Sequence, residues 1–427
     1  MTLPLMLIGL FALILMNVPI AVALGCVAVA AMVATQGTDI LPNVALVMYD
    51  GATKFPLLAI PMFVLAGAIM NASGLSRRLI AFASALLGFI RGGLAMINIA
   101  VSMFFAEISG SAVADVAATG SILIPAMRKR GYPRAFAAAV TSSSASLAII
   151  IPPSIPMILY GVMSDSSIVQ LFVAGVIPGI LGGFSMMLLS YWFARRFGWP
   201  VEEIFQLSNV WRTFKEAAWA LVLPVIILGS IFGGVVTATE GAGIAVIAAL
   251  LIGGGIYREL DWPFLKQAIV DGGIQTAVVM LLVASSALVG VYLTEQQLPQ
   301  QLAQWILGVT ENRYAILMML NVFFLLIGLF IHSAAAIILV VPIVIPLITQ
   351  VGIDPVHFGL VVCLNLAIGQ QTPPVASVLI TACSIAKADV WEVSKVNIWF
   401  IAVLFAILMV VTYIPAIPMS LVEVFYR

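Results

Sequence analysis

Two apolar stretches of the chain are each interrupted by a Pro-Pro pair: IIIPPSIP at residues 149–156 and QQTPPVAS at residues 370–377. The pairs stand 221 positions apart, from Pro152 to Pro373. Proline lacks a backbone N–H and frees the carbonyl one turn earlier, so each pair predicts a break in a helix with carbonyl oxygens left over. Such irregular backbone persists in an apolar medium only where it lines a cavity or meets a ligand.

The same interval of 221 residues relates other landmarks. It separates Pro125 from Pro346 and Gly131 from Gly352, in the same order and register. Each half of the chain therefore has an apolar hairpin, a Gly-containing turn and a helix broken at Pro-Pro. This self-similarity predicts two structural repeats.

Composition defines the environment of these repeats. The 427 residues are 63% hydrophobic and 8% charged, with a mean hydropathy of +1.20. Because one bilayer span takes about 20 apolar residues, we expect an all-α polytopic membrane protein with on the order of ten spans and shorter re-entrant pieces. Equal counts of 18 basic and 18 acidic residues, with no long basic run, exclude a nucleic-acid partner.

Charge predicts how the repeats are oriented. The turn at residues 127–134, MRKRGYPR, has four basic residues, whereas the equivalent turn at residues 348–355, ITQVGIDP, has none. Lys and Arg stay on the cytoplasmic side of membranes, so the turns are predicted on opposite faces and the repeats have inverted topology. This topology puts all basic residues except Lys54, Arg313 and Arg427 on the cytoplasmic side, and both termini in the periplasm.

These patterns predict the organisation of the chain. The first inverted repeat covers residues 1–193, a cytoplasmic interfacial connector covers 194–217, and the second inverted repeat covers 218–427. The re-entrant hairpins are predicted at 94–127 and 314–348, and the broken helices at 135–163 and 357–384.

Polar side chains gather at the hairpin tips and the helix breaks. The tips are Ser109-Gly110-Ser111 and Ile331-His332-Ser333, and the breaks adjoin TSSSAS at 141–146 and NLAIGQQT at 365–372. Hydroxyl and carbonyl oxygens are the ligands that Na⁺ takes in secondary transporters, so each tip and its break predict one sodium site. The serine run is also consistent with close packing of membrane helices.

The same region offers candidates for substrate binding. Carboxylates such as Glu107 and Asp115 are costly in an apolar hairpin and are therefore functional or specifically paired. No Lys or Arg occurs at 92–127, 135–194 or 314–386, so a bound anion depends on helix N-termini, hydroxyls, amides and bound cations. The substrate-binding candidates are Asp115, Ser144, Ser154, His332, Ser333, Gln370 and Gln371.

Six motifs along the chain resemble the large membrane subunit of tripartite ATP-independent periplasmic (TRAP) transporters, and the likeness covers essentially the whole length. They are AIPMFVLAGAIMNASG (59–74), ISGSAVADVAATGSILIPAM (108–127), IIPPSIPMILYG (150–161), LFVAGVIPG (171–179), TATEGAG (237–243) and NLAIGQQTPPV (365–375).

The resemblance implies an elevator mechanism, in which a scaffold carries a mobile transport domain formed by the hairpins and broken helices. It implies sodium-coupled import of an organic acid (a C4-dicarboxylate, a sialic acid or another sugar acid) across the bacterial inner membrane. The implied partners are a small four-helix membrane subunit, a periplasmic substrate-binding protein and membrane lipid. Na⁺ is the only expected metal, and no organic cofactor is expected.

The resemblance also assigns ion-site residues. Sodium site 1 would comprise Ser109, Gly110, Ser111, Ala148, Ile151 and Pro153. Sodium site 2 would comprise Gly328, Gly369, Thr372 and Val375. The chain departs from the family pattern at His332, where an acid is common, and at Ala148, where glycine is common.

Two other functions remain to be compared with transport. An intramembrane hydrolase could use Ser109 or Ser111 with His332, but one nucleophile and one base would leave the duplication unexplained. An anion channel would need a continuous pore with polar rings, whereas the polar groups here cluster at two tips and two breaks.

Overall fold

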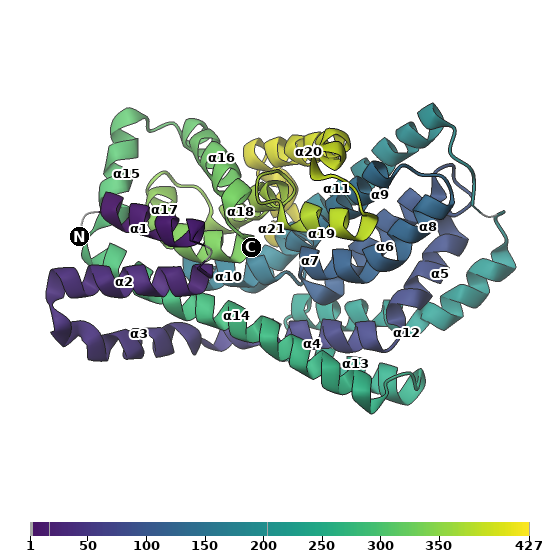
Figure 1. Cartoon of the computed structure of the whole chain (residues 1–427), viewed down its shortest axis with the longest axis horizontal. Coiled ribbons are helices and arrows are strands. Elements are labelled where there is room, and N and C mark those ends of the chain that lie inside the picture. Colours follow the sequence, from purple (N-terminus) through teal and green to yellow (C-terminus); the bar gives the residue numbers. More distant parts are fainter. Residues whose placement is uncertain (1–2, 17, 203, 427) are drawn as a thin grey trace.

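The computed structural model describes residues 3–16, 18–202 and 204–426, and every regular element within them is helical. Among these residues, eight helices are long and apolar enough to cross a membrane. Shorter apolar helices include three of the four halves of the broken helices, at Ile155–Ser164, Pro355–Gly369 and Ser377–Ala386. The expected all-α polytopic fold is confirmed (Figure 1).

The first repeat contains eleven α-helices among the described residues. They are α1 (Leu3–Leu15), α2 (Ile20–Gln36), α3 (Leu41–Ala52), α4 (Ala59–Ala72), α5 (Leu75–Leu87), α6 (Gly93–Ser109), α7 (Ala112–Asp115), α8 (Ser121–Lys129), α9 (Arg134–Ala145), α10 (Ile155–Ser164) and α11 (Ile168–Phe197). A π-helical turn, Val116–Gly120, joins α7 to α8, and 3-10 turns lie at Thr38–Ile40, Phe55–Leu58 and Ser146–Ile149.

The second repeat has a matching series. Its helices are α12 (Leu207–Phe232), α13 (Ala238–Leu250), α14 (Trp262–Glu295), α15 (Leu298–Val309), α16 (Arg313–Phe330), α17 (Ser333–Gln350), α18 (Pro355–Gly369), α19 (Ser377–Ala386), α20 (Val390–Tyr413) and α21 (Ala416–Tyr426). A π-helical turn, Leu251–Ile256, extends α13.

The duplication predicted from the sequence is present in the backbone. Hairpin α6–α8 corresponds to hairpin α16–α17, and broken helix α9–α10 corresponds to broken helix α18–α19. Both Pro-Pro bonds are cis, and both turn glycines, Gly131 and Gly352, have positive φ (86° and 68°). Equivalent residues therefore have equivalent local conformations 221 positions apart.

The packing of the broken helices shows that the repeats are inverted. The first half of one broken helix, α9, packs against the second half of the other, α19, and α10 in turn packs against α18 and α17. When the first half of each broken helix contacts the second half of the other, the two helices run antiparallel. The inverted topology predicted from the basic turn is thus confirmed at the centre of the molecule.

Helix α14 is longer than the sequence pattern indicates. Its 34 residues pack against α2, α3 and α4, and Figure 1 shows it running past them along one side of the molecule. In the first repeat the equivalent stretch is divided into α3 and α4 by the turn that contains Pro56, whereas the second repeat has Ala277 at the position 221 residues on. Without a proline, the helix continues unbroken.

The connector between the repeats is folded onto the first hairpin. Its buried Trp199 packs at tilted angles against Tyr132 and Phe136, with ring centroids 4.6 and 4.3 Å from that of Trp199. Arg130 in the hairpin turn pairs with Glu202 at 3.0 Å. The basic turn of the first hairpin is therefore fixed to the connector by aromatic and ionic contacts.

Inverted topology makes a direct labelling prediction. Lys129 and Gln350 are equivalent, exposed residues at the ends of the two hairpins. We expect Lys129→Cys to react with an impermeant maleimide only from the cytoplasmic side and Gln350→Cys only from the periplasmic side. Labelling of whole cells and of inverted vesicles checks this, and reaction of both from one side would contradict it.

Candidate functional site

The tip of the first hairpin meets the break of the first broken helix. Gly110 adopts the left-handed conformation (φ 58°) at the tip, and its carbonyl accepts a hydrogen bond from the N–H of Ile155 at 3.4 Å. A Cβ atom added to Gly110 would lie 3.0 Å from the carbonyl oxygen of Pro153. The structure therefore brings together the predicted tip and break of site 1.

The second tip meets the second break in the same way. The N–H of Val375 donates to the carbonyl of Leu329 at 3.2 Å, and Gly328 packs directly on Gly369. A Cβ atom on Gly369 would lie 2.5 Å from the Cα of Gly328, so position 369 requires glycine in this arrangement, whereas a Cβ atom on Gly328 would lie 3.1 Å from the Cα of Gly369. Gly328, Gly369 and Val375 of predicted site 2 are thus neighbours.

The other predicted ion-site residues lie around these contacts. Ala148 and Ile151 are buried beside the first break, and the Thr372 hydroxyl donates to the carbonyl of Ile368 at 2.9 Å. Ser111 caps α7, where its hydroxyl accepts from the N–H of Ala114. The side chain of Ser109 lies outside the part of the chain that the structure describes.

Buried polar side chains tie each hairpin to its own broken helix. In the first repeat Asn98 donates to the Thr141 hydroxyl at 2.6 Å, and the hydroxyls of Ser102 and Ser144 are 2.9 Å apart. In the second repeat Asn365, the equivalent of Ser144, donates to Asn321 at 2.7 Å. Asn98, Ser102 and Asn321 were not predicted, although each is a polar residue inside an apolar hairpin arm. Ser144, predicted to bind substrate, holds the first hairpin in this structure.

A second buried network joins the two repeats. The amide of Gln371 donates to the Ser146 hydroxyl at 2.7 Å, and its oxygen accepts from Ser143 at 2.7 Å. Asn397 of α20 donates to the main-chain oxygen of Gln371 at 3.3 Å, and its own oxygen lies 2.6 Å from the Ser143 hydroxyl. All four side chains are fully buried. Gln371, another substrate candidate, therefore spans the breaks.

The remaining substrate candidates are spread over both hairpins and both breaks. Asp115, Ser333 and Gln370 are buried, and Ser154 donates to the carbonyl of Ile149 at 2.7 Å. His332 is exposed and caps α17 by accepting from the N–H of Ala334 at 3.4 Å. As substrate ligands, all seven candidates remain predictions.

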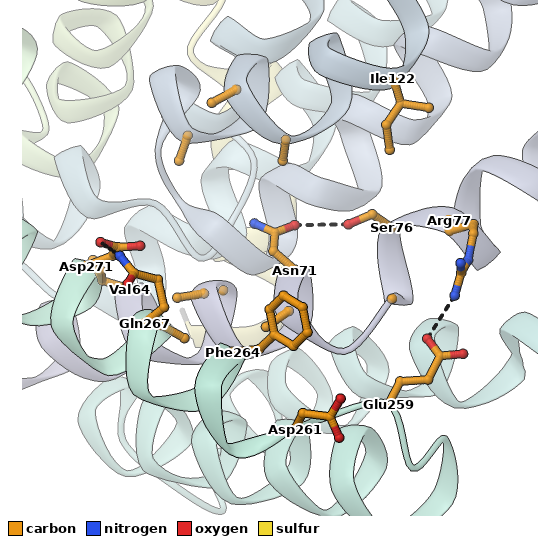
Figure 2. Close-up of a pocket in the computed structure, with 18 of the residues that line it drawn as sticks. Val64, Asn71, Ser76, Arg77, Ile122, Glu259, Asp261, Phe264, Gln267 and Asp271 are labelled. Atoms are coloured by element: carbon orange, nitrogen blue, oxygen red, sulfur yellow. Dashed lines mark hydrogen bonds and ion pairs between the residues drawn. The ribbon is translucent and has the colours of Figure 1, made fainter.

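A cavity of about 1030 Å³ separates the first hairpin from α4 and α14. Figure 2 shows Ile122 of the hairpin above this space and Phe264 of α14 below it. Small residues line both walls: Gly67, Ala68 and Ala72 on α4, and Ala114, Ala117 and Ala118 on the hairpin. Small residues allow helices to approach closely, so these walls are suited to close on each other.

A second cavity, of about 470 Å³, occupies the equivalent place in the other repeat. It lies between the second hairpin, α3 and the C-terminal half of α14. Residues 221 positions apart line the two cavities: Val47 and Ala268, Asp50 and Asp271, Lys54 and Gln275, Ala117 and Ile338, and Gly74 and Glu295. The two spaces are symmetry-related openings of one interface.

The two openings differ in size and in the exposure of their equivalent residues. Ala117 is exposed to the larger cavity, whereas its equivalent, Ile338, is only 3% exposed. Helix α17 packs against α14 and α15 around the smaller cavity. The cavity beside the first hairpin is therefore wider than the one beside the second hairpin.

An ion-pair cluster borders the larger cavity (Figure 2). Glu259 pairs with Arg77 at 2.9 Å and with Arg78 at 2.7 Å, and Arg78 lies 3.9 Å from the ring centroid of Tyr257. Hydrogen bonds from Arg78 hold the pKa of the Glu259 carboxyl below its ordinary value. The cluster fixes the start of α5 to the loop before α14.

The lowered pKa of Glu259 gives a pH-dependent contribution to stability. The ion pairs stabilise the folded protein at neutral pH, and this contribution is lost as the pH falls through the lowered pKa. We expect Glu259→Gln to lower the unfolding midpoint at pH 7 by the equivalent of about 1 kcal/mol or less, because the cluster is partly exposed. Thermal unfolding checks this, and an equal gap between variant and parent under acid conditions would contradict it.

Two inverted repeats, paired tips and breaks, and one opening at each face of an interface together make up the architecture of a secondary membrane transporter. The sequence profile described as "Tripartite ATP-independent periplasmic transporter, DctM component" matches residues 7–417. The chain belongs to this family of large permease subunits, and it is therefore a multi-pass inner-membrane transport protein rather than an enzyme.

Individual relatives agree with this assignment. The chain is 43% identical over 97% of its length to the isethionate TRAP transporter permease protein DctMQ of Oleidesulfovibrio alaskensis, and it spans 65% of that protein. It is 36% identical to the C4-dicarboxylate TRAP transporter large permease protein DctM of Pseudomonas aeruginosa, with 90% of each chain covered.

A solved structure supports the fold. The YdaH transporter of Alcanivorax borkumensis superposes with a TM-score of 0.67 at 15% identity, covering 90% of each chain.

Proposed function

We propose that this chain imports an organic acid by sodium-coupled secondary transport, with an elevator movement of its hairpins and broken helices. The carrying observation is the contact of each hairpin tip with its own helix break, which gathers main-chain oxygens twice in a core without Lys or Arg. Na⁺ takes such oxygen ligands, and a bound cation would supply the positive charge that an organic anion needs.

The unequal cavities support alternating access. The larger cavity has Arg77 and Arg258 at its border, on the side where basic residues are expected to be cytoplasmic. The structure then corresponds to an inward-facing state. Closure of the larger cavity and opening of the smaller one would give the outward-facing state, because the openings are symmetry-related.

The names of the relatives support an organic acid as the proposed substrate class. They name isethionate and C4-dicarboxylates, and others name sialic acid and 2,3-diketo-L-gulonate, all of them organic acids. We include C4-dicarboxylates, sialic acid and other sugar acids among the substrates to be tested, together with isethionate.

The family identity also indicates the partners. We propose that a small four-helix membrane subunit binds the scaffold and that a periplasmic binding protein delivers the substrate. Both termini would then lie in the periplasm, as the charge distribution predicts.

Reconstitution tests this function. Proteoliposomes containing this chain and its small subunit are given radiolabelled organic acid, the binding protein and an inward sodium gradient. We expect uptake only when both the gradient and the binding protein are present. Uptake that persists without either would overturn the proposal in favour of a channel.

Thr372→Ala tests the placement of the second ion site. The hydroxyl of Thr372 lies at the second break next to Gly369, so its loss should weaken sodium binding while the fold is kept. We expect the sodium concentration for half-maximal uptake to rise about tenfold, the equivalent of one lost ligand contact of about 1.4 kcal/mol. An unchanged sodium dependence would show that the second site lies elsewhere.

A further inference from the structure

We propose that Gln371 is a positioning residue that couples the two candidate cation sites through the hydrogen bonds between the two repeats. The inference rests on the sodium-coupled function proposed above, because it concerns how one ion site responds to occupancy of the other.

The position of Gln371 places it between the sites. It directly precedes Thr372 at the second break, and its side chain contacts the segment that leads into the first break. Ser146, which accepts from its amide at 2.7 Å, begins the 3-10 turn Ser146–Ile149 before Pro152. A single side chain thus connects the two breaks.

The bonds around Gln371 make this connection stiff. The Ser146 hydroxyl donates to the carbonyl of Ser143 at 2.7 Å, and the Ser143 hydroxyl lies within hydrogen-bond distance of both Gln371 and Asn397. The four side chains are fully buried, where a broken hydrogen bond leaves polar groups without water to replace it. A shift of one break therefore moves the other.

The duplicated fold does not require this link. The residue equivalent to Gln371 in the first repeat is Ile150, and the residues equivalent to Ser143 and Ser146 are Leu364 and Ala367. The polar bridge joins the two repeats once, because the symmetry-related set of Ile150, Leu364 and Ala367 is apolar and forms no such bridge. The bridge is thus an addition to the shared architecture, located where it touches both candidate sites.

Coupling follows from this geometry. A cation at the first break fixes the carbonyls that follow Ser146, and the bridge then holds Gln371 and the adjacent Thr372 in place. The second cation would bind to a break that is already ordered, and by reciprocity the second ion must favour the first to the same degree.

Equilibrium binding of ²²Na⁺ to the purified full chain in nanodiscs tests the coupling without any substrate. We expect two ions to bind the parent protein with a Hill coefficient near 2, and to bind Gln371→Met with a coefficient near 1. In the variant the sodium concentration at half-saturation should rise by roughly fivefold or more. In this variant the Ser143 hydroxyl still has Asn397 as its hydrogen-bond partner, and the Ser146 hydroxyl still donates to the carbonyl of Ser143.

The possible outcomes distinguish failure of the coupling between the ion sites from failure of the proposed sodium-coupled transport. Two ions bound by the parent with a Hill coefficient of 1, or an unchanged coefficient in Gln371→Met, would overturn the coupling and leave sodium transport intact. Loss of one ion in Gln371→Met would make Gln371 a ligand and also overturn it. A parent protein that binds no sodium would remove the proposed function together with the coupling.

Two control variants distinguish a loss of coupling between the ion sites from a general loss of protein stability. Ser102→Ala removes a buried hydrogen bond to Ser144 inside the first repeat, and it should keep the cooperative isotherm. Ser143→Ala, Ser146→Ala and Asn397→Leu combined with Gln371→Met replace all four polar side chains of the bridge by apolar groups, so the unfolding midpoint should recover while the Hill coefficient stays near 1. Restored cooperativity in this quadruple variant would contradict the proposal.

Discussion

Gly369→Ala is expected to reduce sodium-dependent uptake by about tenfold or more, because overpacking of this kind costs roughly 1–3 kcal/mol. The added methyl group would lie 2.5 Å from the Cα of Gly328 and 2.8 Å from its carbonyl oxygen, so the backbone of the second tip must move. The same movement would displace the carbonyl oxygens proposed to bind sodium. Uptake in proteoliposomes and the unfolding midpoint of the purified protein measure the two consequences.

Gly273→Ala provides the matched control. A Cβ atom at Gly273 meets no other atom within 4 Å, and alanine favours a helix interior over glycine by about 1 kcal/mol. Uptake and stability should therefore be at least as high as in the parent protein. Equal activity of Gly369→Ala and Gly273→Ala would show that the close contact of tip and break is dispensable.

Ala117→Trp is expected to stop transport while the protein remains folded. Ala117 faces the larger cavity, which has room for an indole ring, whereas its equivalent Ile338 is only 3% exposed. If the first hairpin closes on α4 during the cycle, the ring would block closure at a cost of roughly 1–3 kcal/mol or more. Uptake should fall at least about tenfold, with an unchanged unfolding midpoint.

Leu188→Trp controls for the added bulk. Leu188 on α11 is 71% exposed, so a larger side chain there meets no buried surface of this chain. Its uptake should match that of the parent. Normal uptake by Ala117→Trp would mean that the larger cavity stays open throughout transport.

Local chemistry made the tips and breaks predictable. Pro152 and Pro373 interrupt their helices wherever these are placed, and Gly110 marks a turn with positive φ. The basic turn at 127–134 likewise indicates orientation from charge alone. Hairpins, broken helices and inverted topology could therefore be read from the sequence.

Contacts between the repeats could not be predicted in this way. That Gln371 bonds to Ser143 and Ser146 depends on how two segments about 225 residues apart dock, and no periodicity encodes that docking. The different sizes of the two cavities were also unpredictable, because the same sequence must support both states of the interface. The sequence pattern indicated the oxygens at the breaks but not which of them bond to one another.

Helix α14 lines both cavities and sets the distance between them. Its residues up to Gln275 line the larger cavity, and its residues from Val283 onward line the smaller one. About 12 Å of continuous helix therefore separates the two cavities. This separation is set by a count of residues and not by their identity. Related permeases should tolerate many substitutions between these positions but neither insertion nor deletion. A change in length would rotate the α14 residues that line one cavity away from the hairpin that lines its other wall.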